Sequence, residues 1–168
     1  MQRRRLIVGA AGLSLAACSV GEVRTFPTLA SAVTAIESLA RGHRHTGAWS
    51  LAQMLQHVAQ SIHYSIDGYP QARSALFRKA VGGVAFAAFQ ARGKMSHALD
   101  EPIPGAPALD AQLALPIAIS TAQIALRRFE AHTGALAPHF AYGALDKDEY
   151  TRAHLMHLAN HWLEVERS

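Results

Sequence analysis

Apolar residues recur at helical spacing along most of this chain, and no segment shows the alternation of a half-buried strand. The helical pattern covers five stretches: residues 26–39, 50–67, 74–94 and 116–132, and a last one that begins at Asp146. We find no convincing strand and no internal repeat. The pattern therefore predicts an all-α bundle of four main helices plus an additional short helix, with a cofactor position between helices.

Capping residues mark where two of these helices begin. Ser50 is followed three residues later by Gln53, and Asp146 by Glu149. A hydroxyl or carboxylate at the first position and a longer polar side chain three residues on form a capping box. The second and last helices are therefore expected to start at these points.

Two features are expected to interrupt the regular bundle. Gly82 and Gly83 lie inside the third helical stretch and predict a kink or a close helix contact. Residues 100–107 contain three prolines and a glycine, so no helix is expected there. Long loops of this kind often border functional sites.

The last helix carries His154, His157 and His161 on one face. The i,i+4 pair His157 and His161 can direct two imidazoles at one ion, and the pair His154 and His157 could do the same. All three cannot share an ion. Roughly 10 Å of helix rise separates His154 from His161, whereas zinc–nitrogen bonds are about 2 Å long. A metal site therefore needs a further ligand from elsewhere in the chain.

His57 is the candidate for that ligand. It lies at the edge of the apolar stripe of the second helix, as His157 and His161 do on the last helix. Packing the two helices together would bring the three imidazoles to one place. The alternative for all three is a set of interfacial histidines that hydrogen-bond to their neighbours.

Other polar residues are assigned supporting roles or none. Those on or near the site stripes that could orient a ligand or a bound water are His154, Gln53, Tyr64 and Glu164. Glu164 is the only carboxylate among the candidates for a general base. We expect His43 and His45 to be solvated in a turn, and we assign no role to His63, His97 and His132.

The N-terminus has the layout of a bacterial secretory signal. Three arginines precede an apolar run from Leu6 to Ala17 that is too short to span a membrane, and Leu15-Ala16-Ala17-Cys18 resembles a lipobox. We expect a signal peptide over residues 1–18, with lipid on Cys18, a tether over residues 19–25 and the helical domain over residues 26–168. This predicts an exported, periplasmic or cell-envelope lipoprotein. The arginines also resemble a twin-arginine signal, and a plain signal with Cys18 incidental is the alternative.

Charge and cysteine content narrow the functional classes. Three of the 16 Lys and Arg, and none of the 12 Asp and Glu, lie in residues 1–17, so removal of that segment lowers the formal charge from +4 to +1. A nearly neutral domain offers no electrostatic case for binding nucleic acid. Cys18 is the only cysteine, so packing rather than disulfides must stabilise the domain.

Two sequence segments carry a family resemblance. Trp49-Ser50 followed by Met54-Leu55-Gln56-His57-Val58 resembles the start of the DinB-like superfamily, in which this helix supplies the first metal ligand. His139-Phe140 through Gly143, Leu145, Tyr150 and the histidine cluster resemble one branch, the domain of unknown function numbered 1569. The resemblance implies a metal-binding four-helix bundle with a His57, His157 and His161 triad. Relatives include thiol-S-transferases and proposed metal-dependent hydrolases.

Three neutral imidazoles and one open position match a hydrolytic zinc site, and the same ligands tolerate Ni, Fe or Mn. Metal affinity should fall below about pH 6.5, where ordinary imidazoles become protonated. Three functions stay open: a metal-dependent hydrolase or transferase acting on a small molecule, a metal-binding bundle without catalysis, and a structural lipoprotein domain. A homodimer is compatible with each. A cavity beside the metal would favour the enzyme.

Overall fold

The computed structural model describes residues 25–168. The predicted signal peptide, the lipid on Cys18 and nearly all of the tether lie outside this range and stay predictions, which mass spectrometry of the mature chain would test. Among the helices of residues 25–168, none has the length and hydropathy that a membrane crossing requires.

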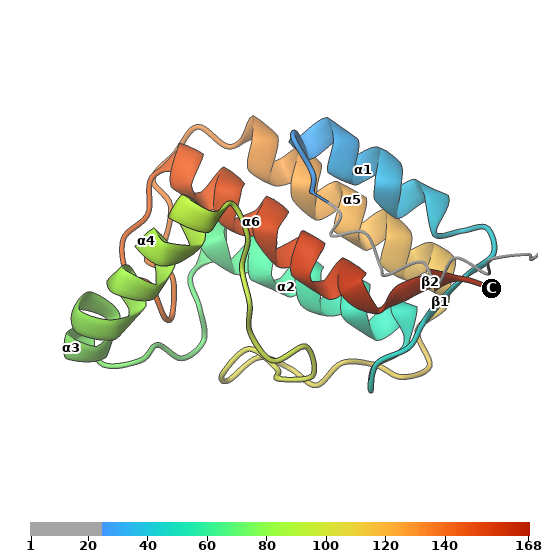
Figure 1. The fold of residues 1–168 in the computed structure, drawn as a ribbon, viewed down its shortest axis with the longest axis horizontal. Coiled ribbons are helices and arrows are strands. Elements are labelled where there is room, and N and C mark those ends of the chain that lie inside the picture. Colours follow the sequence, from blue (N-terminus) through green and yellow to red (C-terminus); the bar gives the residue numbers. More distant parts are fainter. Residues whose placement is uncertain (1–24) are drawn as a thin grey trace, which may run out of the picture.

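Four helices form the bundle, and the predicted all-α fold is confirmed. They are α1 (Leu29–Ser38), α2 (Leu51–Asp67), α5 (Leu115–Ala131) and α6 (Lys147–His161). Figure 1 shows their axes running side by side, with α6 lying against α2. The predicted bounds differ from those observed by at most three residues at the ends of α1, α2 and α5.

Both predicted capping boxes are present. The Ser50 hydroxyl accepts the Gln53 N–H, while the Gln53 side chain accepts the Ser50 N–H. Asp146 and Glu149 exchange the same pair of hydrogen bonds. These contacts satisfy N–H groups that a helix start leaves free, and they fix where α2 and α6 begin.

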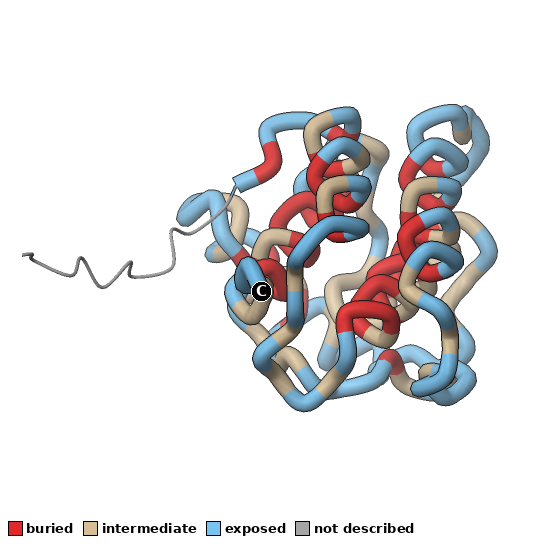
Figure 2. The backbone as a smooth tube through the Cα atoms, turned by 90° about the vertical axis from the view of Figure 1, so that its right-hand side faces the viewer, coloured by how far each residue is buried: buried red, intermediate tan, exposed pale blue. Residues whose placement is uncertain are grey.

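The core of the bundle is built from apolar residues of all four helices. Figure 2 shows buried positions gathered where neighbouring segments of the chain face one another. Its largest fully buried side chains include Tyr150, Phe129, Ile36, Leu55 and Leu126. The Tyr150 hydroxyl donates to the Ala137 carbonyl at 2.7 Å, so this buried polar group has a partner. Packing alone thus supplies a core that contains no disulfide.

The third helical stretch lies outside the bundle. It divides into α3 (Ala75–Phe77), the π-helix η1 (Arg78–Gly82) and α4 (Gly83–Arg92), which project from one end of the molecule in Figure 1. A second small core, formed mainly by Phe86 and Met95 with Ala153 and Met156 of α6, holds this arm against the bundle. The cavity described below lies near this junction.

A short two-stranded sheet corrects the prediction that the chain has no strand. β1 (His43–His45) pairs antiparallel with β2 (Val165–Arg167), which follows the 3₁₀ turn η2 (Trp162–Glu164). The sheet ties the segment after α1 to the C-terminus. His43 and His45 are therefore not loop histidines, and the side chain of His45 is only 1% exposed.

Candidate metal centre

Helices α2 and α6 bring three imidazoles together in the interior. The Nε2 atom of His157 lies 3.1 Å from Nε2 of His57 and 3.1 Å from Nε2 of His161. One nitrogen from each ring lies within 4.8 Å of the other two, and all three residues are buried. Such a group could hold a metal ion.

The spacing of these nitrogens suits a shared ion better than hydrogen bonds between rings. Nitrogens bound at about 2.05 Å with tetrahedral angles lie about 3.3 Å apart, close to the two observed separations. An imidazole nitrogen carries either one proton or one lone pair, so His157 Nε2 can form a good hydrogen bond with only one of its two neighbours. A cation between three lone pairs would satisfy all of them.

Burial keeps these imidazoles in the form that binds metal. Loss of hydration lowers the pKa of His57 to about 4, with a smaller contribution from His97. Burial, followed by the neighbouring His57, lowers the pKa of His161 to about 2, and burial also holds the pKa of His157 well below 6.5. All three rings are therefore neutral near pH 7, with lone pairs free for coordination.

Trp49 covers one side of the triad. Its ring centroid lies 5.0 Å from that of His57 and 6.1 Å from that of His161, nearly parallel to the latter. The Nδ1 atoms of His57 and His161 have no hydrogen-bond partner within residues 25–168, so ring packing, including the contacts with Trp49, holds these rings in place. His45 extends this wall, because its Nδ1 bonds to the Trp49 carbonyl at 2.8 Å.

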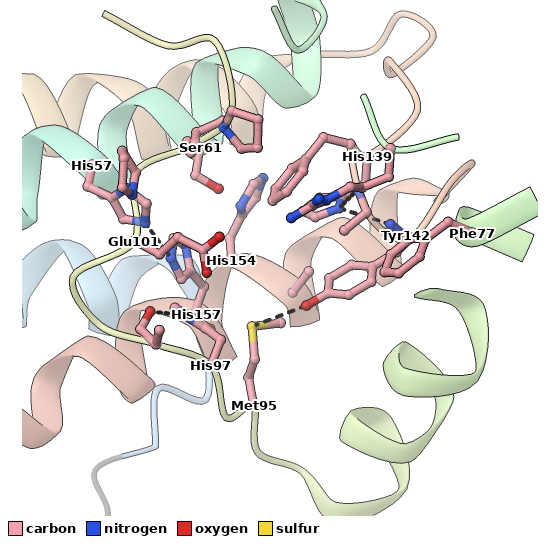
Figure 3. A pocket seen from close by; sticks show the side chains of 18 residues that line it. His57, Ser61, Phe77, Met95, His97, Glu101, His139, Tyr142, His154 and His157 are labelled. Carbon is pink, nitrogen blue, oxygen red and sulfur yellow. Dashed lines mark hydrogen bonds between the residues drawn. The ribbon is translucent and has the colours of Figure 1, made fainter. Parts of the chain in front are cut away.

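A cavity of about 220 Å³ adjoins the triad on the side of His57 and His157. Figure 3 shows His57 and His157 near one end of it and His139 and Tyr142 near the other, with His154 and Ser61 between them. The loop between α4 and α5 supplies His97 and Glu101 to its lining, and Glu101 belongs to residues 100–107, the part that was expected to border a site.

His97 is a site residue that helical periodicity could not reveal. Its ring centroid lies 5.0 Å from that of His157 and 5.3 Å from that of His161. Its Nδ1 bonds to the Ala98 carbonyl at 2.7 Å, so Nδ1 carries the proton and Nε2 the lone pair. His97 Nε2 is buried without a partner among the residues described. Asn160 of α6 donates to the His97 carbonyl at 3.3 Å, which fastens the loop beside the triad.

Of the four predicted supporting residues, one lines the cavity and three do not. His154 lines it, but its Nε2 bonds to Ser65 Oγ at 3.2 Å rather than to a triad ring. Gln53 is engaged in the capping box, and the ring of Tyr64 packs against Tyr69. Glu164 falls beyond the end of α6, where its carboxylate lies 3.5 Å from His45 Nε2.

His139 occupies the opposite end of the cavity, in the turn that precedes α6. Its Nδ1 accepts hydrogen bonds from the backbone N–H groups of Ala141 and Tyr142, at 3.1 and 3.2 Å. Paired N–H···O bonds between His139 and Gly143 close the turn, and Gly143 has a φ of +88°, which favours glycine.

Comparison with known proteins yields one match. No curated protein and no solved structure matches the chain. A family model described as protein of unknown function, DUF1569, matches residues 22–168, which include all four bundle helices and every residue of the candidate metal centre. The chain therefore belongs to the DUF1569 family.

Proposed function

We propose that this protein binds one divalent metal ion through His57, His157 and His161 and uses it for hydrolysis or group transfer on a small molecule. The observation that carries the proposal is the convergence of three buried, neutral Nε2 atoms beside a cavity large enough for a small ligand. Zinc suits three imidazoles and an open position, and Ni, Fe or Mn would fit the same donors.

A metal ion held by these residues would act as a Lewis acid and would lower the pKa of a water bound to it to near neutral pH. The supporting residues predicted from the sequence do not supply a general base beside the triad. His97 provides a proton acceptor there. Its Nδ1–H is held by the Ala98 carbonyl, which leaves the Nε2 lone pair beside the triad to accept a proton. Burial lowers the pKa of His97, and the hydrogen bond to the Ala98 carbonyl and the negative charge of Glu101, which lines the same cavity, oppose that shift.

The cavity favours catalysis over simple metal binding. A storage or structural site needs no space for a second molecule, and structural zinc sites are usually closed by four protein ligands. Here the described residues offer three converging ligands, and the cavity is lined by two of them. The non-catalytic metal-binding domain is the second candidate.

Elemental analysis of purified protein tests the proposal. One equivalent of metal is expected in the parent chain, and His57→Ala, His157→Ala and His161→Ala should each lose most of it because two imidazoles hold an ion weakly. His154→Ala and His97→Ala should retain it. Stoichiometric metal in a His157→Ala, His161→Ala double variant would refute the ligand assignment.

The role of His97 needs a separate measurement on metal-loaded protein. With 4-nitrophenyl acetate as a probe ester, His97→Ala should lower the metal-dependent hydrolysis rate about 100-fold, the usual size of general-base catalysis. His63→Ala, a histidine outside the cavity lining, is the control. Equal rates in the His97 variant and the parent chain would remove His97 from the mechanism but leave the metal site standing.

A further inference from the structure

At the cavity end farthest from the triad, the neighbouring hydrogen bonds determine whether each polar group is a donor or an acceptor. Because His139 Nδ1 accepts two backbone N–H groups, its proton must be on Nε2. The side-chain hydrogen bonds of His139 with residues 25–168 both use Nδ1, so this Nε2–H is left for a group in the cavity. The ring is held by Tyr142, which stacks on it at 4.3 Å with an interplanar angle of 8°. His139 is thus a rigid donor in the cavity lining.

His154, in contrast, offers a hydrogen-bond acceptor to the cavity. Ser65 Oγ donates its only proton to the Ile62 carbonyl at 2.7 Å, so it must accept from His154 Nε2, 3.2 Å away. The proton of His154 is therefore on Nε2, and Nδ1 keeps a lone pair. This Nδ1 forms no hydrogen bond with the described residues, and His154 lines the cavity in the centre of Figure 3. His154 is an acceptor where His139 is a donor.

We propose that this part of the cavity recognises a carboxamide group of the substrate. The carbonyl oxygen of the amide accepts from His139 Nε2–H, and its N–H donates to His154 Nδ1. This identification of a substrate class rests on the proposed function, whereas the binding of a carboxamide does not. Ser61, whose hydroxyl also lines the cavity, adds a third uncharged polar group between the triad and His154.

An uncharged ligand group fits this wall better than an ion. Burial lowers the pKa of both His139 and His154 to about 3, so neither ring is a cation near pH 7. A carboxylate would place a negative oxygen against the His154 lone pair and would lose its hydration without a counter-charge there. The two oppositely charged side chains of the lining, Arg73 and Glu101, are exposed.

Three hydroxamates of equal length test this inference on zinc-loaded protein, with the hydroxamate as the metal-binding end. Their tails are a carboxamide, a carboxylate and an isopropyl group of the same shape. By calorimetry at pH 7, the carboxamide compound should bind at least tenfold more tightly than either of the others. A carboxylate compound that binds as tightly would overturn the inference, and dependence of that binding on Arg73 would assign the cavity to anions.

Two variants test the donor of His139 and the acceptor of His154 separately. His139→Asn keeps a side-chain oxygen that can accept the backbone N–H groups of the turn but removes the Nε2–H donor, and His154→Leu removes the acceptor. Each should reduce the preference for the carboxamide tail to less than threefold. His154→Gln can donate to Ser65 and still offer an oxygen, so it should retain most of the preference, as should the distant control His132→Gln. A preference unchanged in both His139→Asn and His154→Leu would place the amide elsewhere.

A metal-free measurement separates this inference from the metal site. Propionamide added to the apoprotein should shift the imidazole NMR signals of His139 and His154 saturably, whereas propionate should not. If no hydroxamate binds but propionamide does, the proposed metal chemistry is wrong and the carboxamide site stands. If propionamide leaves both rings unperturbed, the carboxamide site is wrong.

Discussion

Lys147 is a single residue that joins two helices of the bundle. From the first turn of α6 its ammonium donates to the carbonyls of Phe129 and His132 at the C-terminus of α5, the latter at 2.8 Å. It also lies 4.0 Å from the centroid of the Phe129 ring. Carbonyls at a helix end have no partner inside the helix, so a cation there is stabilising.

Replacing Lys147 with Met keeps most of the aliphatic stem and removes the ammonium. The variant should lose about 1.5–3 kcal/mol of unfolding free energy, the range for hydrogen bonds to a charged group, as measured by urea denaturation. Lys79→Met, at an exposed position on the arm, should change it by less than about 0.5 kcal/mol. Equal effects of the two substitutions would show that the contacts with α5 contribute nothing specific.

Residues of the site differ in how far the sequence could place them. His57, His157 and His161 were predicted to converge because helical periodicity fixes the face on which each lies. His97 and His139 lie in irregular segments, where spacing gives no direction for a side chain. The turn at His139 is defined by backbone hydrogen bonds between His139 and Gly143, and the loop at His97 by a contact with Asn160. Only tertiary contacts reveal that these two rings line the cavity.

At the scale of elements, the junction of the arm with the bundle depends on a glycine. A Cβ at Gly82 would lie 1.8 Å from the carbonyl oxygen of Ala141, so the π-helix η1 and the His139 turn approach too closely for any side chain. The sequence predicted a kink or a close helix contact at Gly82 and Gly83, whereas the close contact observed is at Gly82 and is made with a turn. Short π-helical segments within α-helices are frequent at functional sites.

Gly82→Ala should therefore cost about 1–3 kcal/mol, as overpacked positions do, and should displace the turn that carries His139. Gly83→Ala is the matched control. Its Cβ would meet only the Arg78 carbonyl, at 3.6 Å, and alanine favours a helix over glycine by about 1 kcal/mol. Urea denaturation measures both effects, and the NMR signals of His139 report the turn. A Gly82→Ala variant as stable as the parent would show that the close approach is not required.

The elements that were missed are those with the weakest local signals. β1 and β2 have three residues each and pair across more than a hundred residues of chain. The segment His43-Arg44-His45 has no apolar alternation, so nothing local identifies it as a strand. The bundle helices, by contrast, were predicted from long apolar stripes and two capping boxes, because those signals are contained within each helix.

At the scale of the whole molecule, the site lies where separate parts of the fold meet. Two bundle helices supply the triad, the loop between α4 and α5 supplies His97, and the turn before α6 supplies His139. The resulting cluster of neutral, buried imidazoles couples the stability of the molecule to pH. Protonation of any of these rings requires either hydration of the interior or unfolding.

In metal-free protein, stability should consequently fall as the pH drops below about 6.5. Unfolded histidines bind protons near that pH, whereas burial lowers the folded pKa of His57 to about 4 and of His139 and His154 to about 3. The unfolded state then binds more protons, and each such histidine costs about 1.4 kcal/mol per pH unit between 6.5 and its folded pKa. Urea denaturation midpoints at pH 7.5 and 5.5 measure this loss of stability. The loss should be smaller in His139→Gln, by the contribution of one histidine. The same lowered pKa values move the predicted loss of metal affinity from pH 6.5 to lower pH. While the fold persists, protons should compete with metal at His57 only near pH 4, and metal release at pH 6 from folded protein would contradict the buried, neutral triad.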